Sequence, residues 1–129
     1  MEDFKKQGKI KGSLKIEGNL ILTGKLEVEK EIEVSGYIDC SSYSIEAGYW
    51  IEAGDSIEAG NSILSQLWIK CKTTLKARLY IYAGLITWKK IEEGEDLIEC
   101  GKLEGGEVKY GKLKEIGLPE SKGKKPKNY

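Results

Sequence analysis

The sequence contains no histidine, and this absence excludes the serine–histidine and cysteine–histidine pairs of nucleophilic catalysis. It has few cysteines: Cys40, Cys71 and Cys100 are odd in number and about thirty residues apart. That spacing favours reduced, buried thiols over a disulfide framework or a zinc site. We therefore expect no catalytic residue, no metal site and no cofactor.

The chain also lacks an excess of charge, because its 21 basic residues balance its 21 acidic residues. No overall field attracts nucleic acid, and no overall acidity is typical of a protein that mimics DNA. No apolar run approaches the roughly 18 residues that span a bilayer. Residues 1–7 lack the apolar stretch of a signal peptide. We expect a cytoplasmic protein of a bacterium or of a phage-infected cell, with no membrane or nucleic-acid partner.

What the sequence does contain is a six-residue repeat. From Ser44 it reads SIEAGYW, IEAGDS and IEAGNS, and a small residue follows each large apolar residue two positions later. In the second half the large apolar residues recur every six positions, at Ile45, Ile51, Ile57, Ile63, Ile69, Leu75 and Ile81. In the first half bulkier pairs begin at the equivalent positions Leu14, Leu20, Leu26, Ile32 and Ile38. The strict period indicates one architecture for both halves.

Extended structure explains this period, whereas a helix does not. Six residues turn a helix by roughly 240° at about 100° each, which scatters the apolar residues around its axis. In a strand, positions two apart lie on one side, so each hexad gives a short inward pair followed by a corner. Three hexads then close a coil, and coils stack at about 4.8 Å. The prediction is an all-β fold, a single-stranded parallel β-solenoid (triangular β-helix) of about 18 residues per coil; an antiparallel sandwich is the alternative, but it needs no such period.

The repeat also predicts how the chain is organised. We expect an N-terminal leader or cap at residues 1–7, the solenoid core at 8–84, the last coil or coils and a C-terminal cap at 85–118, and a flexible basic tail at 119–129. One extra residue within 41–44 interrupts the hexads and predicts a bulge or a wider corner. A cap is expected because solenoid ends expose unpaired strand edges.

Two stretches resemble known repeats. IKGSLKIEGNLILTGKLEVEKEIEVSGYI resembles the repeat core of bactofilins, polymer-forming bacterial cytoskeletal proteins built as β-helices. SIEAGYWIEAGDSIEAGNSI resembles SIEAG-type arrays of bacterial and phage proteins, and its period is similar to that of hexapeptide-repeat acyltransferases. The acyltransferases use a histidine as general base, which this chain lacks. The resemblance covers about residues 8–83 and implies the fold, which hosts enzymes, filaments and inhibitors alike.

Aromatic residues recur with the coil. Trp50 and Trp68 are one coil apart, so we expect both to project outward at one corner, with Glu31, Lys70 and Lys89 as a polar rim. The candidate protein interface comprises Tyr49, Trp50, Leu67, Trp68 and Trp88. Exposed aromatic clusters are enriched among binding hot spots. The alternative is a structural spine, in which the rings stack on one another or pack beneath the C-terminal segment.

Three functions follow from these observations. The leading one is a non-enzymatic protein-binding module. Its small size and its Ile-, Glu- and Lys-rich composition favour a phage- or mobile-element-encoded inhibitor of a bacterial defence complex, similar to anti-CRISPR proteins. The alternative is a bactofilin-like homo-oligomeric scaffold that assembles through its terminal coils. An enzyme comes third, because the acidic run at residues 92–96 is typical of a solvated loop.

Overall fold

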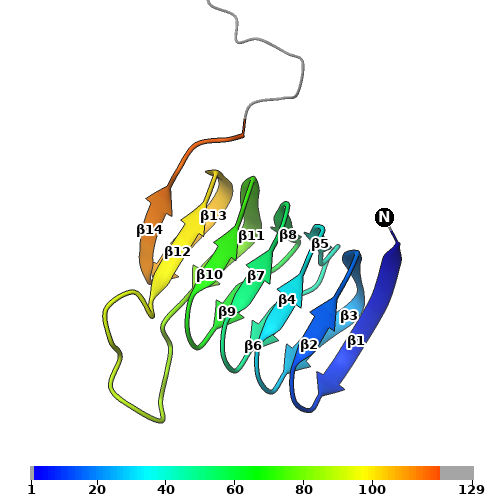
Figure 1. Ribbon diagram of the computed structural model, residues 1–129, viewed down its shortest axis with the longest axis horizontal. Helices are drawn as coiled ribbons and strands as arrows, with labels where there is room; N and C mark the ends of the chain where they lie inside the picture. The colour runs from blue at the N-terminus through cyan, green and yellow to red at the C-terminus, as the bar shows by residue number, and fades with distance from the viewer. Residues whose placement is uncertain (1, 120–129) are drawn as a thin grey trace, which may run out of the picture.

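The computed structural model describes residues 2–119, which form strands, turns and loops only. Every strand pairing is parallel, and the strands wind as a β-solenoid of about six turns (Figure 1). The predicted fold class is therefore confirmed. No helix long and apolar enough to cross a membrane occurs among the described residues.

Most strands are short, but a few are long because they continue round a corner from one face of the solenoid to the next. In chain order they are β1 (Asp3–Ile10), β2 (Leu14–Ile16), β3 (Asn19–Val28), β4 (Ile32–Val34), β5 (Ile38–Asp39), β6 (Ile45–Ala47), β7 (Ile51–Ala53), β8 (Ile57–Ala59), β9 (Ile63–Ser65), β10 (Ile69–Cys71), β11 (Thr74–Tyr82), β12 (Leu97–Cys100), β13 (Lys102–Tyr110) and β14 (Lys112–Glu115).

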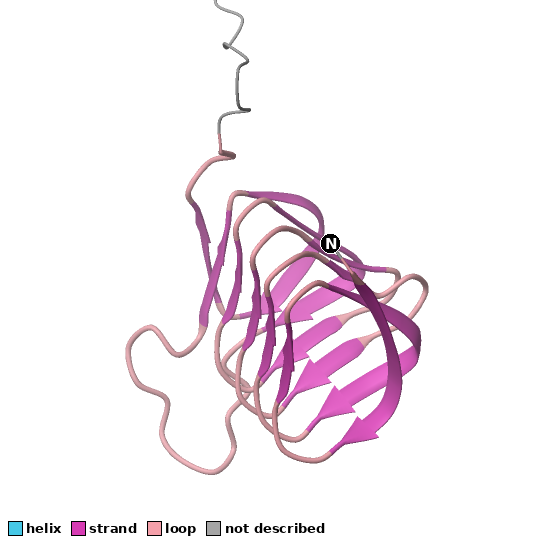
Figure 2. Cartoon of the chain, turned by 45° about the vertical axis from the view of Figure 1, so that its right-hand side comes forward, coloured by secondary structure: helices cyan, strands magenta, loops and turns pink. Residues whose placement is uncertain are grey.

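Three ladders of strands make three faces, and Figure 2 shows the coils nested one behind another. The third face is the six-stranded sheet β2-β4-β7-β10-β12-β14. The first and second faces share the eight-stranded sheet, because long strands continue round the corner between them. For example, the first part of β3 pairs with β5 on the first face, and its last part pairs with β6 on the second.

Equivalent hexad positions lie above one another, so the core is a set of apolar columns. On the third face Ile32 pairs with Ile51, Ile51 with Ile69, and Ile69 with Ile98. The large side chains buried completely or almost so are Leu20, Leu22, Leu26, Ile32, Ile38, Ile45, Ile51, Ile57, Ile63, Ile69, Leu75 and Ile81. Burial of each contributes about 1.5–3 kcal/mol relative to exposure. The inward assignment made from the period is correct at these positions.

The predicted interruption at residues 41–44 is a wider corner. Register partners on opposite sides of it are 19 residues apart, as in Ile32 and Ile51. Partners on the same side are 18 apart, as in Leu14 and Ile32 before it and Ile51 and Ile69 after it. The extra residue is absorbed in a turn in which Ser41 has a φ of 52° and the Tyr43 amide donates to the Cys40 carbonyl at 2.8 Å. The stacking therefore continues undisturbed on both sides.

The glycine of the Glu-Ala-Gly motif is required by close packing of neighbouring corners. A Cβ atom on Gly48 would collide with the carbonyl oxygen of Glu29, and one on Gly54 would collide with that of Ser35. Neither glycine has a positive φ. Their amides donate to the carbonyls of Val28 and Val34 in the preceding coil, both at 2.9 Å. The corner thus carries the ladder round the edge of the solenoid.

The solenoid begins earlier than the sequence indicated. Residues 3–7, expected to belong to a leader or cap, are part of β1, which pairs with β3 and forms the first coil. Phe4 takes the inward position opposite Leu20 and packs against the core. The hexad pattern misses this strand because Lys6 stands where Leu22 stands in the next coil.

The last coils lie within residues 85–118, the range expected to hold the last coil or coils and a C-terminal cap. Residues 97–115 wind as strands β12, β13 and β14, and the described residues up to 119 add no further element. From Ile98 onward the inward positions are Ile98, Leu103, Val108 and, one coil after Ile98, Leu113; they are five residues apart rather than six. The change of period conceals this coil from a hexad search. Of the expected basic tail, residues 120–129 lie outside the described part of the chain.

We predict that Ile57→Asp unfolds the domain. Ile57 is fully buried between Ile38 and Leu75, so the substitution would leave an unpaired carboxylate in an apolar column. The cost of several kcal/mol is large against a total stability of about 5–15 kcal/mol. Thermal melts followed by far-ultraviolet circular dichroism measure the effect, with Glu58→Gln on the outward side as the control. A melt of Ile57→Asp that matches the control would refute the hexad assignment.

Candidate functional site

The strongest candidate site is an aromatic corner, defined by Tyr49, Trp50, Trp68 and Trp88, where the second face meets the third. Trp50 and Trp68 directly precede β7 and β10, so coil stacking places one ring on the other. Their centroids are 4.7 Å apart and their planes differ by 7°. Both side chains are half-buried. The sequence-predicted ladder is therefore present for this pair.

Each indole N–H of the pair is bonded to a carboxylate of the preceding coil. Trp50 Nε1 donates to Glu33 Oε2 at 2.9 Å, and Trp68 Nε1 donates to Glu52 Oε2 at 2.7 Å. Glu33 and Glu52 are register partners in one outward column, where two like charges lie side by side. The indole donors offset that repulsion. The hexad pattern does not reveal these bonds, although tryptophan and glutamate recur with the same coil spacing.

Lysines complete the surroundings of the stacked pair. Lys15 Nζ lies 3.8 Å from carboxylate oxygens of both Glu31 and Glu33. At the other end of the stack, Lys70 Nζ lies 5.4 Å from the centroid of the Trp68 ring. Such ion pairs and cation–π contacts near the surface contribute on the order of 1 kcal/mol or less each. The expected rim residues Glu31 and Lys70 therefore do lie beside the tryptophans.

Leu67 does not belong to the exposed surface. Its side chain is only 5% exposed, whereas the sequence analysis expected it to project outward with Tyr49. The reason is the anchoring of this corner from inside: the Ser65 hydroxyl donates to the carbonyls of Tyr49 at 2.7 Å and Trp68 at 3.0 Å. The Leu67 carbonyl also accepts the Gly84 amide at 2.8 Å. Leu67 is thus part of the packing beneath the corner.

Trp88 lies on a loop and not in the column of Trp50 and Trp68. It lies in a loop between β11 and β12, residues 83–96, named here the corner loop, which projects from the body of the solenoid (Figure 1). The column above Trp68 continues with Leu97, the residue before Ile98, and not with Trp88. Trp88 instead packs on Tyr49, with ring centroids 5.9 Å apart, and remains 55% exposed. The loop therefore extends the aromatic surface outward.

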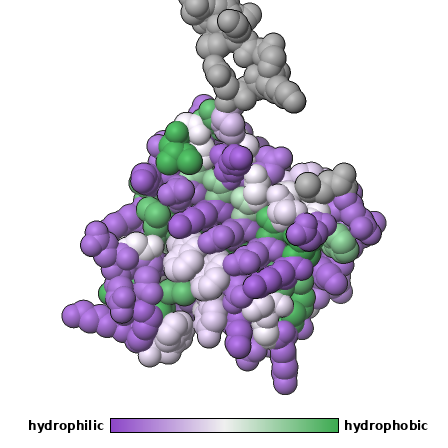
Figure 3. Space-filling view, in the orientation of Figure 1, coloured by the Kyte–Doolittle hydropathy of each residue, from purple (hydrophilic) through white to green (hydrophobic). Residues whose placement is uncertain are grey.

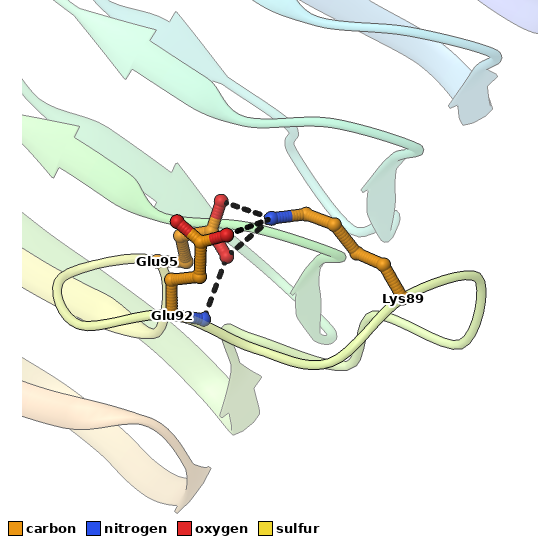
Figure 4. A network of polar contacts seen from close by, with 3 residues as sticks. All are labelled: Lys89, Glu92 and Glu95. Atoms are coloured by element: carbon orange, nitrogen blue, oxygen red, sulfur yellow. Dashed lines mark hydrogen bonds and ion pairs between the residues drawn. The ribbon is translucent and has the colours of Figure 1, made fainter.

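A polar network holds the corner loop in shape (Figure 4). Lys89 Nζ lies 2.8 Å from both carboxylate oxygens of Glu95 and 3.7 Å from the carboxylate of Glu92. The Glu92 amide also donates to Glu95 Oε1 at 2.8 Å. Pairing with Glu95 raises the pKa of Lys89, and the same contact lowers the pKa of Glu95. The acidic run is thus a loop, as expected, and one of its carboxylates is structural.

The rest of the surface is mainly charged, as Figure 3 shows for one face of the molecule. Shallow depressions recur beside the Glu-Ala-Gly corners, with volumes of about 340, 460 and 540 Å³. Their outward carboxylates are Glu27 and Glu46, Glu33 and Glu52, and Asp39 and Glu58. They recur because the motif recurs on each face. No group of three or more acidic or cysteine side chains in residues 2–119 is arranged to hold a metal ion.

The three thiols are buried, as the sequence predicted. Burial raises the pKa of Cys71 to about 12 and that of Cys100 to about 11, and it raises the pKa of Cys40 as well. At neutral pH all three are protonated, and a protonated thiol is a poor nucleophile. The geometry offers no activated cysteine.

Comparison of the chain with protein-family models, with curated proteins and with solved structures finds no match. The aromatic corner is therefore the feature of this molecule from which a function can be inferred.

We predict that the Trp68–Glu52 hydrogen bond couples the two residues energetically. Trp68→Phe and Glu52→Ala should together destabilise the fold by less than the sum of the single effects, with a coupling energy of about 1 kcal/mol. Urea unfolding of the four proteins in the cycle measures it. In the control cycle, Trp88→Phe takes the place of Trp68→Phe, because the donor to Glu52 is Trp68 and not Trp88. The effects of the two substitutions in the control cycle should be additive. Additivity in both cycles would contradict the bond.

Proposed function

We propose that this chain is a non-enzymatic protein-binding solenoid whose contact surface is the aromatic corner. The observation that carries the proposal is the placement of the corner loop. Loops of this length without secondary structure are uncommon in compact domains and are often functional. Insertions between solenoid repeats commonly form the binding face. Here the insertion packs Trp88 against Tyr49, next to Trp50 in the chain, and leaves the Trp88 side chain 55% exposed to solvent.

The two halves of the corner have different parts in the proposed interface. The indole N–H groups of Trp50 and Trp68 are hydrogen-bonded within the chain, so they are not free to bond to a partner. The two rings therefore form a rigid floor. Trp88 and Tyr49 form the accessible anchor above that floor. A rigid aromatic surface loses little conformational entropy when a partner binds. Large aromatic residues also supply most of the energy at typical hot spots.

The narrower proposal is that the partner is a bacterial defence effector and that the chain is an inhibitor encoded by a phage or mobile element. Its support is the small size of the chain and its Ile-, Glu- and Lys-rich composition. A rigid solenoid with a projecting loop is a suitable shape for blocking a site on a larger protein. The charged faces around the corner supply the polar rim that such interfaces carry.

A second candidate, self-assembly through the terminal coils, is favoured by one observation. The last coil and the residues after it expose Tyr110, Leu113, Ile116 and Leu118, each between 41% and 54% accessible. Against open stacking, Lys6 occupies an inward position on β1, opposite Leu22. Inward-pointing charge on an edge strand opposes edge-to-edge association, because a second copy would bury it. Binding at the aromatic corner is therefore the better supported function.

We predict that Trp88→Ala weakens partner binding by about 2 kcal/mol, or roughly 30-fold in Kd, while leaving the melting temperature nearly unchanged. The partner is first isolated by affinity capture from bacterial lysate with the full chain as bait, and Kd is then measured by calorimetry. Leu79→Ala is the matched control, since Leu79 is 43% exposed at a different corner, where its amide bonds to Asn61. Equal losses for the two variants would contradict the proposal.

Sedimentation velocity over a concentration series separates the two candidates. A binding module stays a monomer or small oligomer at all concentrations, whereas a scaffold forms species that grow with concentration. If the protein forms filaments, and the Trp88→Ala variant forms them equally well, the result would favour self-assembly through the terminal coils over binding at the aromatic corner.

A further inference from the structure

Cys71 and Cys100 occupy neighbouring rungs of the same core column. Cys71 ends β10 and Cys100 ends β12. These strands are parallel, with Ile69 opposite Ile98 and Lys70 opposite Glu99. The next rung places Cys71 beside Cys100, and both are buried on the inward side. Consistent with this proximity, Cys100 is among the groups that raise the pKa of Cys71.

The spacing of this rung fits a disulfide. Neighbouring strands lie about 4.8 Å apart, and the Cα atoms of disulfide-bonded cysteines are usually about 4.4–6.8 Å apart. The two coils remain in contact beyond the cysteines, because the amides of Gly101 and Lys102 donate to the Thr73 carbonyl at 2.7 and 3.0 Å. The backbone therefore needs no rearrangement to bring the sulfur atoms together. Only the Cys71 side chain must turn away from the Thr74 carbonyl, which lies 3.5 Å from Sγ.

We propose that Cys71 and Cys100 are a redox-sensitive pair that forms an intramolecular disulfide between the ends of β10 and β12. With an azodicarboxamide oxidant such as diamide, one thiolate adds to the N=N bond, and the other thiolate then attacks that sulfur. The S–S bond forms, the S–N bond breaks, and the hydrazine product leaves with the two electrons and two protons of the thiols.

The raised pKa values make this oxidation slow but do not block it. Thiolate is the attacking species, so the rate follows the small fraction of deprotonated thiol and rises with pH toward the pKa values of about 12 and 11. Cys40 has no thiol beside it. Ile38 pairs with Ile57 and Asp39 with Glu58, so the next residue along, Cys40, lies beside Ala59. Cys40 therefore stays reduced and serves as an internal control.

The disulfide would change how the corner loop is connected to the solenoid. The residues between the two cysteines include all of β11 and the whole corner loop, residues 83–96. A covalent bond between Cys71 and Cys100 would therefore keep the two parts of the chain joined even when the loop is cut. This inference does not depend on the proposed binding function.

The test treats the native full-length chain with diamide at pH 8.5, followed by denaturation, alkylation and peptide mapping by mass spectrometry. We expect a cross-linked peptide that joins Cys71 to Cys100, with Cys40 alkylated. Cutting the corner loop with protease should then give two fragments that separate on a denaturing gel only after reduction. Cys100→Ala should abolish the cross-link, whereas Cys40→Ala should preserve it. Equal alkylation of all three cysteines after oxidation, or a bond to Cys40 or to a second molecule, would overturn the proposal.

Discussion

The stacking of each coil on the next in register is the constraint on which the rest of the structure depends. Backbone hydrogen bonds link every coil to its neighbour, and they align the inward residues into columns only if successive coils keep the same path. A surplus residue must therefore be absorbed at a corner, as at Ser41. Glycine is needed where corners of adjacent coils touch, as at Gly48. The same register stacks Trp50 on Trp68 and places Cys71 beside Cys100.

Because a repeat fixes register, the sequence predicts the repeated part of this fold well. The period of six located the inward residues, the three faces, the wider corner at residues 41–44 and the Trp50–Trp68 pair. It failed where the period changes: the last coil uses a spacing of five, and β1 carries Lys6 at an inward position. It also misplaced Leu67 and Trp88, since side-chain contacts of Ser65 and the course of the corner loop decide those positions. Periodicity contains no information on either.

The features that point to function are the departures from the repeat. The regular faces carry columns of outward charges, which ion pairs such as Lys76 with Glu58 at 3.9 Å partly neutralise. They also carry three shallow depressions that resemble one another. The corner loop, by contrast, occurs once in the described residues. It has its own Lys89–Glu95 anchor and brings an exposed tryptophan against Tyr49. Holding a large aromatic ring in water is costly for stability and useful for association. A rigid scaffold that presents one such loop is consistent with a binding role.

The central claim, that the coil is the repeating structural unit, is tested most directly by removing one coil. Deletion of residues 49–66 takes out one complete turn, because Ile51 and Ile69 are partners 18 residues apart. Leu67 then follows Gly48, and Trp68 takes the place of Trp50 in the column. The account predicts a folded protein with a β-type circular dichroism spectrum and a cooperative urea transition. The shorter deletion of residues 49–63 should unfold, since it turns Gln66 and Trp68 inward. A shorter deletion that folds as well as the full-coil deletion would contradict the account.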